Sequence, residues 1–218
     1  MRDIRKDKEY FIKYINYQYT RIEKKVSKLE DSDAEKKQRI YLSLIGYEND
    51  LLKAEFSIGA TKEKLCSLFE KTIIRAKEYN NITYDDLLNL LSLAVMLEEK
   101  GNCLGLIKSN EAKIKNDRLL NYIAEYIEGK TAQWNMQLSI SKEYTELNLV
   151  FESNDKEEAL LTYLDDWYKK HSEYGWYDSH LNEADTYCGY WSFESAALAK
   201  ILGLDTEKLQ QSVYYPKL

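Results

Sequence analysis

Apolar residues recur along most of the chain at steps of three or four, which is the spacing of one face of an α-helix. Residues 3–30 show one such apolar stripe, with lysine and glutamate on the other faces. A polar break at residues 31–33 offers an N-cap, and the stripe resumes over residues 34–58 until Gly59. A short link between two long helices predicts an antiparallel hairpin.

The same periodicity predicts further helices, of which the one over residues 87–97 is apolar on nearly every face. Such a helix belongs in the interior. Residues 130–153 have the weakest pattern; they favour one helical piece through Trp134 and Leu138 and another through Tyr144 and Leu147, and an isolated strand within 146–151 stays an alternative. The other expected helices cover residues 61–76 with a stop at Asn80-Asn81, 115–128, 157–168, 190–201 and 205–212, and a Thr83–Asp86 capping box precedes 87–97.

With one proline and eight glycines in 218 residues, the chain has few breaks for a turn-rich sheet protein. No internal repeat of 20–50 residues is visible. We therefore predict an all-α fold, built as an irregular stack of antiparallel helix pairs. Residues 1–110 form an N-terminal helical segment and residues 111–218 a C-terminal one, which we expect to share one compact body.

The location and the kind of partner follow from charge and cysteine content. The three cysteines, the absence of an apolar leader and an apolar run of only 11 residues at 87–97 favour a cytoplasmic protein that does not span a membrane. A net charge of −6 argues against binding to nucleic acid. Residues 151–190 contain ten acidic and three basic residues, which gives this stretch −7. It is either a solvated face or a surface that steers a basic partner.

Candidate chemistry is sparse. The two histidines, His171 and His180, could be grouped with Asp185 and Cys188 as a metal cluster, but their spacing matches no common zinc pattern. No phosphate-binding loop or nucleophile-elbow motif is present. We expect no metal, no cofactor and no catalytic residue, and we interpret both histidines as hydrogen-bonding groups within the fold.

Ordered motifs in the last third of the chain resemble those of the PoNi family, immunity proteins against PoNe-type DNA-degrading toxins of bacterial polymorphic toxin systems. The N-terminal pairs Tyr10-Phe11 and Tyr14-Ile15 are similar to that family's first segment. One departure is Lys217, where the family tail often carries an acid. The motifs are Tyr163-Leu-Asp-Asp-Trp-Tyr168, Trp176-Tyr-Asp-Ser-His180, Gly189-Tyr-Trp-Ser-Phe-Glu194-Ser-Ala-Ala197, Leu204-Asp205 and Tyr214-Tyr-Pro216.

The resemblance implies a helical, cytoplasmic protein that binds and blocks an antibacterial nuclease without catalysis. A nuclease must attract phosphate, so its DNA-binding face should be basic and should suit the acidic stretch. Tyrosine and tryptophan in the loop after residue 170 are typical interface anchors, although they can equally pin that loop to the body. The predicted toxin-binding residues are Asp165, Asp166, Tyr174, Trp176, Asp178, Glu183 and Asp185.

Residues inside the motifs also have a structural interpretation. Glu194 stands among apolar neighbours, so we expect it to hydrogen-bond within the fold and not to contact the toxin. Two other functions stay open from the sequence. One is a helical scaffold or adaptor protein without a toxin partner, and the other is a metal-dependent hydrolase that uses His171 and His180. The oligomeric state does not follow from the sequence.

Overall fold

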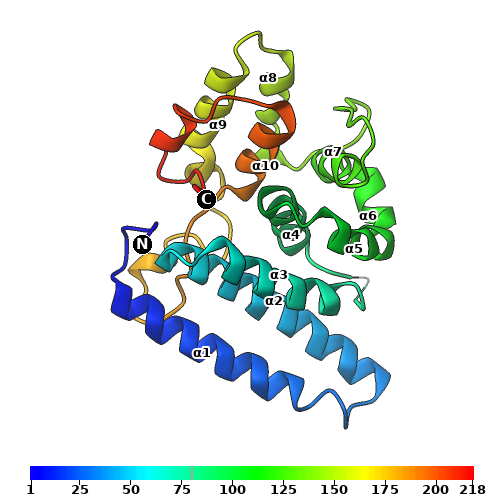
Figure 1. Ribbon diagram of the computed structural model, residues 1–218, viewed down its shortest axis with the longest axis vertical. Helices are drawn as coiled ribbons and strands as arrows, with labels where there is room; N and C mark the ends of the chain where they lie inside the picture. The colour runs from blue at the N-terminus through cyan, green and yellow to red at the C-terminus, as the bar shows by residue number, and fades with distance from the viewer. Residues whose placement is uncertain (80) are drawn as a thin grey trace. The chain divides into compact units, whose positions relative to one another are not determined.

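The computed structural model describes residues 1–79 and 81–218, and its regular secondary structure is helical (Figure 1). Within this described part the chain forms no sheet, and its β-type pairing is an isolated bridge between Asp117 and Ser139. The predicted all-α class is therefore confirmed. None of the described helices is both long enough and apolar enough to cross a bilayer.

The chain divides into two compact units, each assembled from stretches that are distant in sequence. Unit 1 contains Met1–Leu90 and Asp178–Gly189, and unit 2 contains Leu91–Tyr177 and Tyr190–Leu218. The expectation that residues 1–110 and 111–218 form two segments of one compact body stays a prediction.

Unit 1 begins with a hairpin in which α1 (Lys8–Val26) and α2 (Ala34–Ile58) run antiparallel, as predicted (Figure 1). α1 is shorter than the expected range 3–30. It starts where the Asp7 side chain accepts a hydrogen bond from a backbone N–H three residues on, at 2.8 Å. Asp33 caps α2 in the same way, again at 2.8 Å, which confirms the predicted cap.

The next helix, α3 (Lys62–Ala76), is bounded by local signals that the sequence carries. Gly59 adopts a φ of 96°, a left-handed conformation that closes α2 and that glycine adopts without strain. The Thr61 hydroxyl then caps α3. The predicted stop at Asn80-Asn81 includes Asn80, which lies outside the described residues; α3 itself ends at Ala76.

The helix α4 (Tyr84–Leu97) begins after Thr83, as predicted. The Asp86 N–H donates to the Thr83 hydroxyl at 3.2 Å, which is the first bond of the predicted capping box, and that hydroxyl donates to the Asp86 carboxylate at 2.8 Å. Over residues 87–97 every side chain except Asn89 is buried.

Unit 2 is built from shorter helices, among which α6 packs on α7, α8 on α9, and α10 on both α7 and α9. Their bounds are α5 (Leu104–Ser109), α6 (Glu111–Asn116), α7 (Arg118–Ile127), α8 (Leu147–Glu152), α9 (Lys156–Lys170) and α10 (Phe193–Leu202). Short 3-10 segments are η1 (Lys100–Cys103), η2 (Lys142–Tyr144) and η4 (Leu209–Gln211) in unit 2, and η3 (Ser179–Leu181) in unit 1.

Three expectations for the weaker patterns are wrong. The helical piece through Trp134 and Leu138 is irregular, and the backbone carbonyls of Asn135, Met136 and Leu138 accept hydrogen bonds from the Arg118 side chain. The possible strand within 146–151 is the helix α8, since no neighbouring strand is there to pair with it in the described chain. The terminal helix expected over 205–212 is reduced to the single turn η4.

Candidate protein-interaction surface

Two adjacent aspartates stand on the outward side of α9. Asp155 caps the helix by accepting the Glu158 N–H at 3.0 Å, and two lysines fill the last turn, so both ends suit the helix dipole. The opposite face is packed into unit 2. Because of this orientation Asp165 and Asp166 are exposed. The buried residues of α9 are Leu160, Tyr163, Leu164 and Trp167.

Glu194 on α10 holds α9 in place from inside unit 2. Its Oε1 accepts hydrogen bonds from the Tyr163 hydroxyl at 2.6 Å, the Trp167 indole N–H at 2.7 Å and the Ser192 hydroxyl at 2.6 Å. Glu194 is 3 % exposed. The pKa of Tyr163 is raised well above its ordinary value, first because the Tyr163 side chain is buried and second because the negative Glu194 carboxylate lies beside it. The predicted internal role of Glu194 is confirmed, and the group is not available to a partner.

The tyrosines and tryptophans after α9 form one aromatic cluster with the helix. The Trp176 ring stacks on Trp167 with centroids 5.5 Å apart, and Tyr177 stacks on Tyr168 at 4.4 Å. Tyr174 lies against Trp176 at 5.7 Å. Both predicted anchors, Tyr174 and Trp176, are half-buried. They fix the loop against α9 and keep part of each ring accessible, which is compatible with a role in binding.

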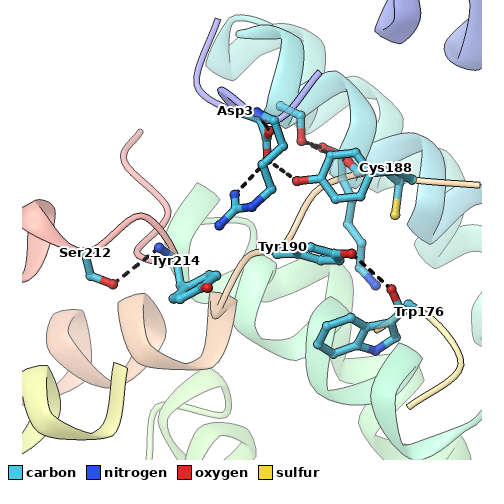
Figure 2. A network of polar contacts seen from close by, with 10 residues as sticks. Asp3, Trp176, Cys188, Tyr190, Ser212 and Tyr214 are labelled. Atoms are coloured by element: carbon cyan, nitrogen blue, oxygen red, sulfur yellow. Dashed lines mark hydrogen bonds and ion pairs between the residues drawn. The ribbon is translucent and has the colours of Figure 1, made fainter. Parts of the chain in front are cut away.

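The C-terminal motifs complete this cluster. Figure 2 shows the Tyr190 hydroxyl directed at the Trp176 carbonyl oxygen, 3.3 Å away, and the Tyr214 N–H bonded to Ser212. The Tyr214 ring stacks on Tyr168 at 5.5 Å with only 4° between the planes. The Tyr214-Tyr-Pro216 motif therefore packs into unit 2, whereas Lys217 after it is exposed.

The remaining predicted contacts lie in Asp178–Gly189, which belongs to unit 1. This stretch is tied to the N-terminal segment, to α1 and to α2: the Tyr187 hydroxyl donates to the buried Asp3, the Tyr187 N–H donates to the Tyr10 hydroxyl, and the Ser57 hydroxyl donates to the Cys188 carbonyl. Asp3 and Cys188 are labelled in Figure 2. Asp185 forms an ion pair with Lys13 of α1, with 2.7 Å between Nζ and Oδ2. Its charge is thus partly compensated.

The seven predicted residues accordingly divide between the two units. Unit 2 carries Asp165, Asp166, Tyr174 and Trp176, and unit 1 carries Asp178, Glu183 and Asp185. Asp178 has a φ of 56°, and Glu183 is exposed. Each set is a candidate surface of its own unit.

The histidines serve packing. The two ring nitrogens of the buried His171 lie 2.6 Å from the Trp167 carbonyl oxygen and 3.3 Å from the Tyr144 hydroxyl. His180 belongs to unit 1, where its ring lies 6.0 Å from that of Tyr187. Among the described residues, no three histidine, cysteine or acidic side chains are arranged so that they could hold a metal ion.

Two adjoining hollows on unit 2 were not predicted from the sequence. The first, of about 420 Å³, is shallow and is lined by Leu149 and Ala159 together with Glu152, Asp155 and Glu158. In the sequence, the acidic residues within 152–158 are the signal that could have indicated this first hollow. The second hollow, of about 470 Å³, shares Asp155 with the first and adds acidic residues from a distant stretch of the chain. It is lined by Asn154, Asp155, Glu157, Asp205, Glu207 and Lys208.

Comparison with known proteins bears on this architecture. No curated protein matches the chain. The crystal structure of protein PA2201 from Pseudomonas aeruginosa has a similar fold, with a TM-score of 0.67 and 18 % identity over 92 % of this chain and 84 % of that one. Two family models match: the N-terminal one of PoNe immunity proteins over residues 2–109 and the C-terminal one over residues 115–218. The chain therefore belongs to the family of PoNe immunity proteins (PoNi), which are immunity proteins and not enzymes.

Proposed function

We propose that this chain neutralises a PoNe-type DNase toxin by stoichiometric binding in the cytoplasm, where it covers or distorts the toxin's DNA-binding or catalytic surface. The observation that carries this proposal is that the two PoNi family models together span nearly the whole chain. The toxin domain is expected to be basic where it meets DNA. The immunity protein then needs an acidic face and buried anchors, and no reactive group.

The acidic face of α9 supports this role. Asp165 and Asp166 are exposed, and neither forms an ion pair with another described residue. Exposed carboxylates attract a partner of the opposite charge and raise the association rate. Tyr174 and Trp176, half-buried beside the same helix, supply aromatic area for the contact at a small entropic cost.

Unit 1 supplies the second part of the proposed contact. Glu183 is exposed at the tip of Asp178–Gly189, and the anchoring of this stretch to α1 presents it in a defined shape. A preformed acidic loop loses little conformational entropy when it binds. Asp178 and Asp185 belong to the same loop as Glu183, and we propose that they contact the toxin together with it.

The test is protection and binding with a PoNe-type nuclease domain from the same genome. Cells that produce the nuclease should survive only when this protein is produced with it. Asp165→Lys combined with Asp166→Lys should lower the association rate about tenfold at low salt, and Glu183→Lys should lower it by a smaller factor. Glu70→Lys on α3 is the control at another exposed site, and its charge change equals that of Glu183→Lys.

Two results would count against the proposal at different levels. If the wild-type protein neither binds the nuclease nor protects the cell, the proposed function is wrong. If it binds and protects, and the acidic variants bind with unchanged rate and salt dependence, the function stands and the predicted surface is wrong.

A further inference from the structure

Leu149 marks an apolar groove on unit 2 that has no occupant within the described chain. Its side chain is 53 % exposed on α8, and Ala159 and Thr162 of α9 lie in the same hollow. We propose that this groove is a docking site for a lysine- or arginine-bearing amphipathic segment of the toxin. This inference rests on the proposed function and adds to it a hollow that adjoins the predicted contacts, since Thr162 stands one turn before Asp165 and Asp166 on α9.

The groove is preformed, because α8 is held firmly from both sides. The Lys156 ammonium donates to the Val150 and Ser153 carbonyls, each at 3.2 Å, and so closes the turn between α8 and α9. On the other side the Phe151 ring stacks on Trp134 with centroids 4.0 Å apart and 7° between the planes. Leu149 is therefore exposed on a fixed element, where a docking surface needs little rearrangement.

The buried Arg118 adds a further hold on α8. Its guanidinium donates to the Asn148 side-chain oxygen at 2.6 Å, and the Trp134 indole N–H donates to the same oxygen at 3.0 Å. Asn148 stands next to Leu149 in the helix. The exposure of Leu149 is consequently a feature of a well-anchored turn.

Carboxylates line the same hollow as Leu149. They belong to Glu152, Asp155 and Glu158, and none of them makes an ion pair within residues 1–79 and 81–218. The adjoining hollow adds Asp205 and Glu207, with Lys208 as its cation. The helix dipole accounts for acids in the first turn of α9, such as Glu158. It does not account for Glu152, Asp205 and Glu207, which stand outside that helix.

Charge complementarity identifies the occupant. An apolar side chain can contact Leu149, and neighbouring ammonium or guanidinium groups can meet the carboxylates of the two hollows. A nucleic-acid backbone would be repelled by the same carboxylates. A second copy of this chain, docked through a two-fold axis at this hollow, would place two identical sets of carboxylates against each other.

The experiment measures binding of an inactivated PoNe-type nuclease domain to the full chain by surface plasmon resonance. Leu149→Ala should raise the dissociation rate about tenfold, as loss of a central apolar anchor does. Leu104→Ala on α5 is the matched control, since Leu104 is 50 % exposed in the same unit. Glu152→Lys combined with Glu158→Lys should lower the association rate about tenfold and flatten its salt dependence, whereas Glu70→Lys should not.

The outcomes separate the groove from the function. If the wild type binds the nuclease and both groove variants bind as it does, the groove proposal is overturned while the immunity function stands. If the wild type does not bind at all, the proposed function fails first. Sedimentation of the protein alone is the second measurement: a dimer that Leu149→Ala dissociates would assign the groove to a second copy and would also overturn the proposal.

Discussion

Removing the Glu194 carboxylate should strongly destabilise the protein without acting on the binding surface directly. Glu194→Ala leaves the Tyr163 hydroxyl, the Trp167 indole N–H and the Ser192 hydroxyl without their acceptor, and the first two of these donors belong to buried side chains of α9. Each buried donor that loses its partner costs about 1–3 kcal/mol. Because water can enter the space left by the side chain, we expect a total loss of about 3–5 kcal/mol of unfolding free energy.

Two milder variants calibrate this value. Tyr163→Phe removes one donor and leaves the other two bonds to Glu194 intact, so the loss should be about 1 kcal/mol. Glu194→Gln keeps the volume of the side chain but replaces a charged acceptor by a neutral one, so its loss should fall between the other two.

Urea unfolding followed by tryptophan fluorescence and far-ultraviolet circular dichroism measures all three variants. The urea concentration at the unfolding midpoint should be highest for Tyr163→Phe, lower for Glu194→Gln and lowest for Glu194→Ala. A Glu194→Ala protein that loses less than about 1 kcal/mol would refute the reasoning, because buried donors would then have found other acceptors. The folded Tyr163→Phe protein should bind the toxin as the wild type does, since the side chain is buried.

Two further predictions concern other buried charges. Glu48 is 4 % exposed beside Arg75, and burial, only partly offset by that guanidinium, raises the pKa of Glu48 from 4.5 to about 7. The folded state thus holds a proton that the unfolded state has released, so stability should fall as the pH rises from about 4.5 to about 7, by up to about 3 kcal/mol. In thermal denaturation Glu48→Gln should flatten this dependence, and an unchanged pH profile would contradict it. Arg118→Lys should lower the free energy of unfolding in urea by about 2–4 kcal/mol, because one ammonium cannot donate to all the acceptors of the guanidinium. The variant should also be cleaved more readily within residues 130–141 by a protease. A variant that resists the protease as well as the wild type would contradict this prediction.

Local signals explain which parts of the fold could be predicted. The caps at Asp33 and Thr61 and the capping box at Thr83 each depend on atoms within three residues, so their sequence spacing predicts them. The helix expected through Trp134 and Leu138 does not form, for the opposite reason. The carbonyls of Asn135, Met136 and Leu138 accept hydrogen bonds from Arg118, and no pattern inside this stretch indicates a partner that precedes it by more than ten residues.

The sequence alone determined the helical class, the buried α4, the internal role of Glu194 and the family resemblance, because all of these are written in short-range periodicity and ordered motifs. Only the tertiary structure decided which surface charges are free to act. It paired Asp185 with Lys13, packed part of Trp176 against α9, and brought Asp205 to the hollow beside Asp155. A side chain's exposure and its partners are set by contacts between residues far apart in the chain, and neither composition nor spacing records them.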